Sequence, residues 1–221
     1  MNASIRYTLF LAGALTTVIA GMSTVCADSV VVYPVQSGLI DDGSCCSPYA
    51  YANSSSSTFL LTGCFNSTYG CGYQRERAAW RWDLGGQVPE GAEVTNAYIR
   101  WDQTSSCFAN YVDVYIDANT QVLSSSYCAQ MRGGSDQTYN NQSYWASAVS
   151  WAINPEVIEE ALSGGYLCMQ TDNGTGADGC AIYNSGPNRA RVIINYNYPQ
   201  ITGACCASDG ACFETEQASC E

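Results

Sequence analysis

The amino-acid sequence predicts an all-β fold, a sandwich of two antiparallel sheets with one short helix and several disulfides. Short runs with an apolar residue at every second position recur along the chain, and Gly, Ser and Asn lie between them. Charged residues make up only 13% of the chain, while Ser, Thr, Asn, Gly and Tyr are abundant, as is common in extracellular β proteins. A body of roughly 170 residues also falls within the range of one domain.

The predicted strands follow one another from the start of this body to its end. In the run 75–85, Trp80 and Trp82 share one face with other apolar residues, and Trp101 does the same in 93–102. We therefore expect these three tryptophans in the core. The predicted strands lie in the runs 29–35, 57–64, 75–85, 93–102, 111–117, 165–171, 180–186 and 189–199.

One helix is predicted over residues 154–163. Asn154 is a suitable N-cap, Pro155 suits the first helical position, and Glu156 lies at the positive end of the helix dipole. Gly164 and the glycine after it end the helix. A single apolar stripe is formed by Val157, Ile158, Ala161 and Leu162. A helix this short requires tertiary packing, so we expect it across one end of a sheet.

The chain is predicted to have three parts. Residues 1–27 resemble a secretory signal peptide, with Arg6 before an apolar run and cleavage expected after Ala27. Residues 28–199 are the sandwich. Residues 200–221 hold four cysteines and almost no apolar residues, which indicates a disulfide-held appendage. The protein is therefore expected outside the cell or on its surface, with no segment inserted in a membrane.

The cysteine count agrees with an oxidising compartment. Without the signal, 12 cysteines remain, and the absence of histidine makes a zinc site a poorer explanation than disulfides. The spacing suggests loops closed between Cys64 and Cys71, Cys107 and Cys128, and Cys168 and Cys180, although connectivity is not readable from sequence. The predicted disulfide cysteines are Cys45, Cys46, Cys64, Cys71, Cys107, Cys128, Cys168, Cys180, Cys205, Cys206, Cys212 and Cys220.

The charged residues exclude several classes of function. The chain has eight arginines, no lysine and 20 acidic residues, so the mature protein carries about −13 and repels nucleic acid and anionic lipid. The absence of histidine and lysine excludes a Ser-His-Asp triad and a Schiff base. Hydrolysis by two carboxylates needs neither residue. Acidic residues that point outward from strands are nonetheless more often solvated positions, so we do not expect an enzyme.

A family resemblance covers most of residues 29–199. Trp82-Asp83-Leu84, Pro89, Gly91-Ala92, Val94 and Ala97 match, in order and spacing, the strand–turn–strand arrangement of DNRLRE-type domains. The resemblance implies a jelly-roll sandwich carried by secreted bacterial proteins. Some members, including carbohydrate-binding modules of family 96, bind acidic polysaccharides such as alginate, and others are repeated in surface proteins. The tail resembles a GACC-x-x-DG-x-C repeat of secreted bacterial proteins.

The run 111–117 contains a stripe of alternating tyrosine and aspartate. Because side chains alternate across a strand, Val112, Val114 and Ile116 can face the core while this stripe faces outward. Aromatic rings stack on sugars and carboxylates accept hydroxyl hydrogen bonds, so a glycan platform is one interpretation. Ordinary cross-strand packing is the other. The candidate face, continued onto the strand 93–102, comprises Tyr98, Arg100, Asp102, Tyr111, Asp113, Tyr115 and Asp117.

A calcium site is a further candidate. The segment 171–179 offers the oxygen ligands Asp172, Asn173, Thr175 and Asp178 in a Gly-rich stretch, and a second acidic turn begins near Asp41. The spacing departs from an EF-hand. A plain hairpin loop built from turn-forming residues explains the same composition, so structural calcium stays one of two interpretations.

Two functions remain in contention. The favoured one is a non-catalytic module that binds extracellular polysaccharide. The alternative is a structural protein of the cell surface, matrix or an extracellular filament, which assembles with copies of itself through its faces or edges. The run 29–35 is the candidate edge strand for such assembly.

Overall fold

The computed structural model describes residues 25–41, 50–53, 56–66, 73–102, 112–142, 148–173, 180–199, 202–206 and 212–216. The chain divides into two units, one formed by Val25–Pro199 and the other by Met1–Thr24 with Gln200–Glu221. The second unit contains a two-stranded sheet of β13 (Thr202–Cys206) and β14 (Cys212–Glu216), in which Cys206 lies opposite Cys212.

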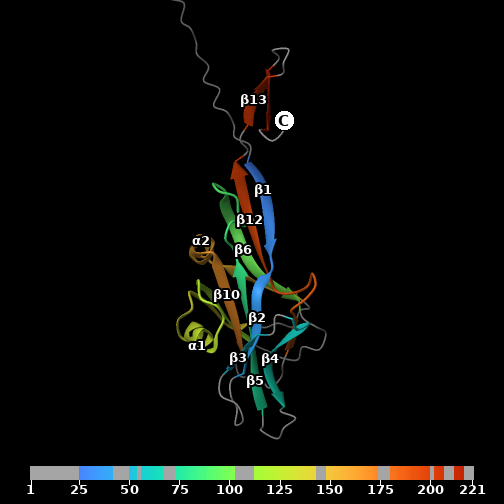
Figure 1. Cartoon of the computed structure of the whole chain (residues 1–221), viewed down its shortest axis with the longest axis vertical. Helices are drawn as coiled ribbons and strands as arrows, with labels where there is room; N and C mark the ends of the chain where they lie inside the picture. The colour runs from blue at the N-terminus through green and yellow to red at the C-terminus, as the bar shows by residue number, and fades with distance from the viewer. Residues whose placement is uncertain are drawn as a thin grey trace, which may run out of the picture. The chain divides into compact units, whose positions relative to one another are not determined.

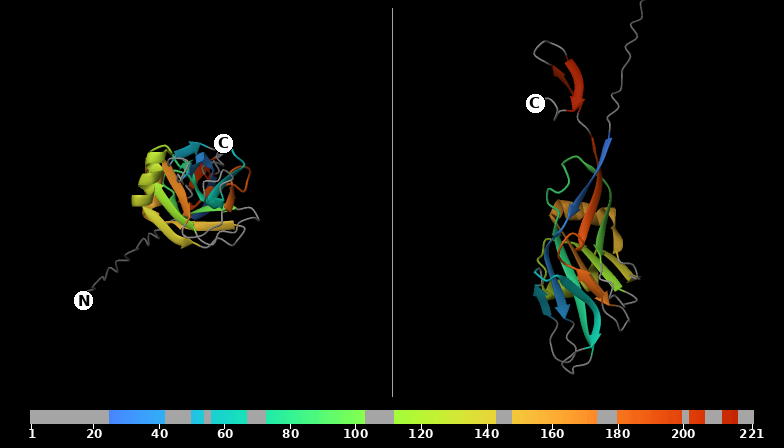
Figure 2. Two further views of the ribbon diagram at one scale, coloured as in Figure 1. Left: turned by 90° about the horizontal axis from the view of Figure 1, so that it is seen from below. Right: turned by 90° about the vertical axis from the view of Figure 1, so that its right-hand side faces the viewer.

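The unit Val25–Pro199 is an all-β sandwich of two antiparallel sheets, as predicted (Figure 1, Figure 2). The first sheet has four strands in the order β1 (Val25–Val32), β12 (Arg191–Pro199), β6 (Glu93–Asp102) and β9 (Ala148–Ile153). We call it the four-stranded sheet.

The second sheet has eight strands. Its main path runs through β11 (Cys180–Tyr183), β4 (Phe59–Asn66), β5 (Tyr73–Asp83), β10 (Tyr166–Asn173), β7 (Val112–Ala118) and β8 (Gln137–Gln142). Off this path, β2 (Pro34–Asp41) pairs with β5 and with β3 (Ala50–Asn53). The strand β5 is central to this sheet because β2 occupies one of its edges and β10 and β4 share the other.

Tryptophan rings from both sheets meet in the core. Trp80 and Trp82 on β5 and Trp101 on β6 are buried, as the alternation of apolar residues predicted. The ring centroids of Trp80 and Trp101 lie 5.6 Å apart, and Trp101 lies 4.2 Å from Trp151 of β9. Aromatic pairs at these distances add about 0.5–1.5 kcal/mol beyond the area that they bury.

The predicted helix is present as α2 (Pro155–Gly164). Asn154 precedes it at the N-cap, and Gly165 ends it with a φ of 93°, a conformation that glycine adopts without strain. Its residues Val157, Ile158 and Ala161 are buried in the core. The helix packs against β7, β10 and β6 (Figure 1).

The expectation of a single helix was wrong, because a second one, α1 (Ser125–Gly134), lies between β7 and β8. Ser124 caps it by accepting a hydrogen bond from the backbone N–H of Tyr127 at 3.2 Å. Only Tyr127, Cys128 and Met131 are buried, and two glycines occupy its last turn. So few apolar positions give no clear helical period in the sequence. In the described part of the chain, no helix is long and apolar enough to cross a membrane.

The edge strand β1 begins before the expected cleavage point. Val25, Cys26 and Ala27 pair with Pro199, Tyr198 and Asn197 of β12, and the ladder continues to Val32 opposite Val192. Cleavage after Ala27 would leave five residue pairs of this ladder, Asp28 to Val32. In Figure 1, β1 and β12 run side by side along their length.

Candidate functional site

The predicted binding face is divided between the two sheets. Tyr98, Arg100 and Asp102 lie on β6 in the four-stranded sheet, whereas Asp113, Tyr115 and Asp117 lie on β7 in the eight-stranded sheet. On each strand the alternate residues are buried between the sheets, so the two sets point away from each other on opposite outer faces. The expectation of one continuous face was wrong, because the chain changes sheet between β6 and β7. Tyr111 lies outside the described residues.

The half of the face on β7 is covered by α1. The Tyr127 hydroxyl of this helix donates a hydrogen bond of 2.7 Å to Asp117, which is buried. Burial raises the pKa of Asp117, and the neighbouring carboxyl of Asp136 raises it further. Burial also raises the pKa of Tyr115. Asp117 and Tyr115 therefore pack beneath α1 and do not form an open binding surface.

Asp172 is a partner of two arginines. Its Oδ1 accepts from Nε of Arg77 at 2.6 Å, and its Oδ2 lies 2.9 Å from Nε of Arg132 on α1. Both carboxylate oxygens are therefore engaged by guanidinium groups, which argues against the expected role of Asp172 as a calcium ligand. Within the described residues, no three acidic or cysteine side chains gather as metal ligands.

The other predicted calcium ligands cannot be placed. Thr175 and Asp178 lie outside the described residues, as does the side chain of Asn173. The turn after Asp41 is likewise outside them.

The other half of the predicted face, formed by Tyr98, Arg100 and Asp102, lies on the outer face of the four-stranded sheet. Strand register places Tyr98 in a row across all four strands, between Ala152 of β9 and Ile193 of β12, with Val31 of β1 at the end. Ala152 and Val31 are exposed, and Tyr98 and Ile193 are half-buried. This row gives the face a largely apolar centre.

Polar side chains flank that row on both sides. On one side, Arg100 lies opposite Arg191, and both Nη atoms of Arg191 donate to Oδ2 of Asp102 at 3.2 Å. Arg100 has 42% of its side chain exposed, and its Nε is 3.7 Å from Asp102. These two guanidinium groups share one carboxylate, so this side of the row carries a net positive charge.

On the other side of the row, Asn195 lies opposite Asn96 and donates a hydrogen bond of 2.6 Å to its Oδ1. Six residues of β6 and β12 lie together on this outer face, and we call them the platform: Tyr98, Arg100, Asn96, Arg191, Ile193 and Asn195. Sequence reasoning missed the residues on β12, although each alternates with a buried apolar residue, because the partner strand of β12 was not known.

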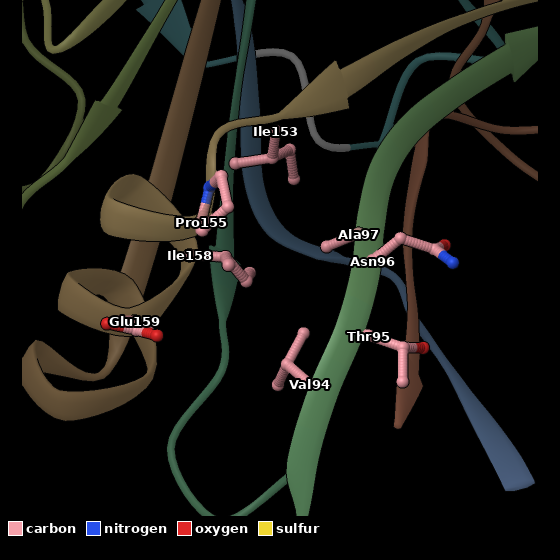
Figure 3. A pocket seen from close by; sticks show the side chains of 8 residues that line it. All are labelled: Val94, Thr95, Asn96, Ala97, Ile153, Pro155, Ile158 and Glu159. Carbon is pink, nitrogen blue, oxygen red and sulfur yellow. The ribbon is translucent and has the colours of Figure 1, made fainter. Parts of the chain in front are cut away.

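A small cavity opens between β6 and α2 (Figure 3). Thr95 and Asn96 are among the residues that line it, but their side chains point away from α2, whereas those of Val94, Ile153 and Ile158 lie between β6 and α2 (Figure 3). Its volume of about 40 Å³ is room for a few water molecules, each of which needs roughly 10–15 Å³. This cavity is too small to hold a sugar ring.

Comparison with known proteins gives no independent assignment. No protein-family model matches this chain, and no curated protein matches it. The resemblance to DNRLRE-type domains remains a prediction. The residues that suggest it lie at the end of β5, in the turn where Gly91 has a φ of 80°, and at the start of β6.

Two of the predicted disulfide cysteines are free thiols in this structure, Cys128 and Cys168, and both are buried. The loop closure suggested between Cys168 and Cys180 was wrong. Cys168 lies opposite Arg81 of β5, whereas Cys180 lies opposite Thr62, at the level of the Gly63–Glu76 pair. These levels differ by about four residues, roughly 13 Å along the strand, while a disulfide joins Cα atoms less than about 7 Å apart.

The other predicted pairs are not tested by the geometry. Cys107 and Cys71 lie outside the described residues, and the side chain of Cys64 is also outside them. The same holds for the side chains of Cys45, Cys46, Cys180, Cys205, Cys206, Cys212 and Cys220.

Proposed function

We propose that this protein is a secreted, non-catalytic module that binds an acidic extracellular polysaccharide on the platform. The observation that carries this proposal is the arrangement around Tyr98, with an arginine row on one side and an asparagine row on the other. A tyrosine ring packs against a sugar ring, and amides exchange hydrogen bonds with its hydroxyls. Guanidinium groups pair with carboxylates in a bidentate geometry.

The charge of the whole chain makes this arrangement informative. A protein of net charge −12 repels an acidic polymer at long range. Directly opposed like charges such as Arg100 and Arg191 also destabilise a sheet by roughly 0.2–1 kcal/mol. A ligand with carboxylates would relieve that repulsion. Since the Debye length at physiological salt is about 8 Å, such a site acts locally despite the overall negative charge.

The test is binding of the secreted chain to polyuronates and to neutral polysaccharides, measured by titration calorimetry in a calcium-free buffer. We expect saturable binding to the polyuronate alone. We further expect the variant Tyr98→Ala/Arg100→Gln to bind at least about tenfold more weakly, a loss of about 1.4 kcal/mol. Arg132→Gln is the matched control because Arg132 is 39% exposed and lies on α1, which packs on the other sheet. It should bind normally.

Equal affinity of the platform variant and Arg132→Gln would contradict the proposal. So would the absence of binding to any acidic polymer. Circular dichroism of each variant would establish that it is folded.

A second candidate function is self-assembly through the edge strand β1. Among the described strands, β1 pairs with β12 alone, and its one charged residue is Asp28. At the opposite edge of the sheet, β9, one backbone carbonyl is already engaged: Ala152 O accepts hydrogen bonds from Gln137 at 2.8 Å and Tyr139 at 2.6 Å. A long, nearly uncharged edge is typical of strands that pair with another chain.

A further inference from the structure

Two buried thiols lie together beneath α1. Cys128 belongs to α1 and Cys168 to β10, and neither side chain has any exposed surface. Both belong to a single small apolar cluster, separate from the main core, made of Ile40, Ala79, Leu123, Tyr127, Cys128, Met131 and Cys168. Tyr127, whose hydroxyl donates to Asp117, belongs to the same cluster. The two cysteines therefore lie in the same buried interface between helix and sheet, one on each side of it.

The helix α1 has few other means of attachment. It is a short helix with three buried residues and two glycines in its last turn, and isolated helices of this length are marginally stable in water. It covers a polar part of the sheet where Asp117, Asp172 and Arg77 lie. A covalent bond at Cys128 would hold it there.

We infer that Cys128 and Cys168 form an intramolecular disulfide in the oxidised protein, which joins α1 to β10. The inference rests on the proposed secretion, because disulfides persist in oxidising compartments. It excludes the pairs Cys107–Cys128 and Cys168–Cys180 suggested by spacing. It makes Cys107 and Cys180 available to other cysteines.

The chemistry requires an oxidant with a disulfide, either a thiol–disulfide oxidoreductase or oxidised glutathione. One cysteine thiolate attacks the oxidant's disulfide and forms a mixed disulfide, and the second thiolate then displaces the oxidant. The two cysteines lose two electrons and two protons, and the oxidant becomes two thiols. Burial raises the pKa of Cys128 to about 12 and that of Cys168 to about 11, so folded thiols react slowly. The bond therefore forms during folding, before α1 packs on the sheet.

Peptide mapping of the full chain, prepared by secretion into an oxidising compartment, tests this pairing. Free thiols are blocked under denaturing conditions, and the unreduced chain is cut after Arg, Asp and Glu. Cuts at Asp117 and Arg132 release 118–132, which contains Cys128 alone, and cuts at Glu160 and Asp172 release 161–172, which contains Cys168 alone. The digest thus separates both cysteines from Cys107 and Cys180.

We expect the peptides 118–132 and 161–172 joined, with a mass two hydrogens below their sum, and both separate after reduction. Recovery of either peptide with a blocked thiol from a chain whose other cysteines are disulfide-bonded, or linked to any other cysteine, would overturn the inference. If every cysteine of the chain is blocked, the secreted preparation is replaced by refolding with oxidised glutathione. Blocked thiols at Cys128 and Cys168 after that step would also overturn it. Polysaccharide binding is measured separately, so its failure leaves this outcome unchanged.

Serine variants provide a second readout. If the bond exists, Cys128→Ser, Cys168→Ser and the double variant should lower the melting temperature by the same amount, because each removes the same disulfide. Additive losses for the two single variants would indicate two independent buried thiols and would contradict the pairing.

Discussion

Arg77 is almost completely buried, with 1% of its side chain exposed, and Asp172 balances its charge. Bringing these two groups out of water costs several kcal/mol for each ion, which the short contact between them offsets. On the helix side, Nε of Arg132 lies 2.9 Å from Oδ2 of Asp172 and forms a second ion pair. Asp172 therefore stabilises the contact between α1 and the sheet, whereas one of the two interpretations from sequence made it a candidate calcium ligand.

At this scale we predict the cost of removing one partner. Asp172→Asn keeps the shape of the side chain but removes the carboxylate that makes the short ion pair with Arg77. The free energy of unfolding should fall by about 3–5 kcal/mol, because the Arg77 charge stays buried after this ion pair is lost. Urea denaturation measures the change, and Asp28→Asn, at an exposed position, is the control. A loss below about 1 kcal/mol for Asp172→Asn would show that the buried pair is not needed.

At the scale of elements, the two helices differ in how they begin. In α1, Ser124 Oγ accepts a hydrogen bond from the backbone N–H of Tyr127, whereas Asn154 before α2 makes no side-chain cap bond. Pro155 at the start of α2 supplies a fixed φ instead. In addition, α2 has a stripe of apolar residues in the main core, while α1 rests on the smaller cluster.

These differences predict unequal effects of removing the two cap residues. Ser124→Ala should lower the free energy of unfolding by about 1 kcal/mol, the usual cost of losing a capping oxygen. Asn154→Ala should change it by only a few tenths of a kcal/mol, because no capping bond is lost. Thermal or urea unfolding of both variants checks the comparison. Equal losses would mean that the α1 cap bond contributes nothing.

At the scale of the whole molecule, the proposed self-assembly would occur through the edge β1, which pairs with β12 alone among the described strands. Two copies related by a two-fold axis can pair β1 antiparallel to β1, which joins their four-stranded sheets. If Val30 lies on the axis, Asp28 of each copy lies opposite Val32 of the other, so the two carboxylates do not meet. Val31 is 44% exposed on this strand. Copies of a chain with net charge −12 otherwise repel each other.

Edge association predicts a specific effect of one charge. Val31→Lys should abolish any concentration-dependent assembly seen by sedimentation velocity, because an edge lysine opposes strand addition. Val122→Lys introduces the same charge at a residue that is 61% exposed before α1, and it should leave assembly unchanged. A monomeric wild-type chain at every concentration would instead remove self-assembly as a candidate function.

The sequence by itself determined the sheet content, the buried tryptophans and the helix α2. These features depend on local periodicity: apolar residues recur at every second position on strands and form one stripe on α2. Such periodicity can be read directly from the sequence. The strand faces were also correct one strand at a time: Tyr98 and Asp117 each point away from the core, as alternation requires.

Only the tertiary structure decided which strands are neighbours. It placed β6 and β7 in different sheets, covered Asp117 with α1 and brought Arg191 opposite Arg100. It also placed Cys128 and Cys168 in one buried cluster. Such contacts join residues far apart in the chain, and no local pattern encodes the partner of a strand. The platform exists only because β6 and β12 are neighbours in the sheet. Strand order of this kind depends on how the whole core packs, so the sequence pattern of one strand does not reveal it.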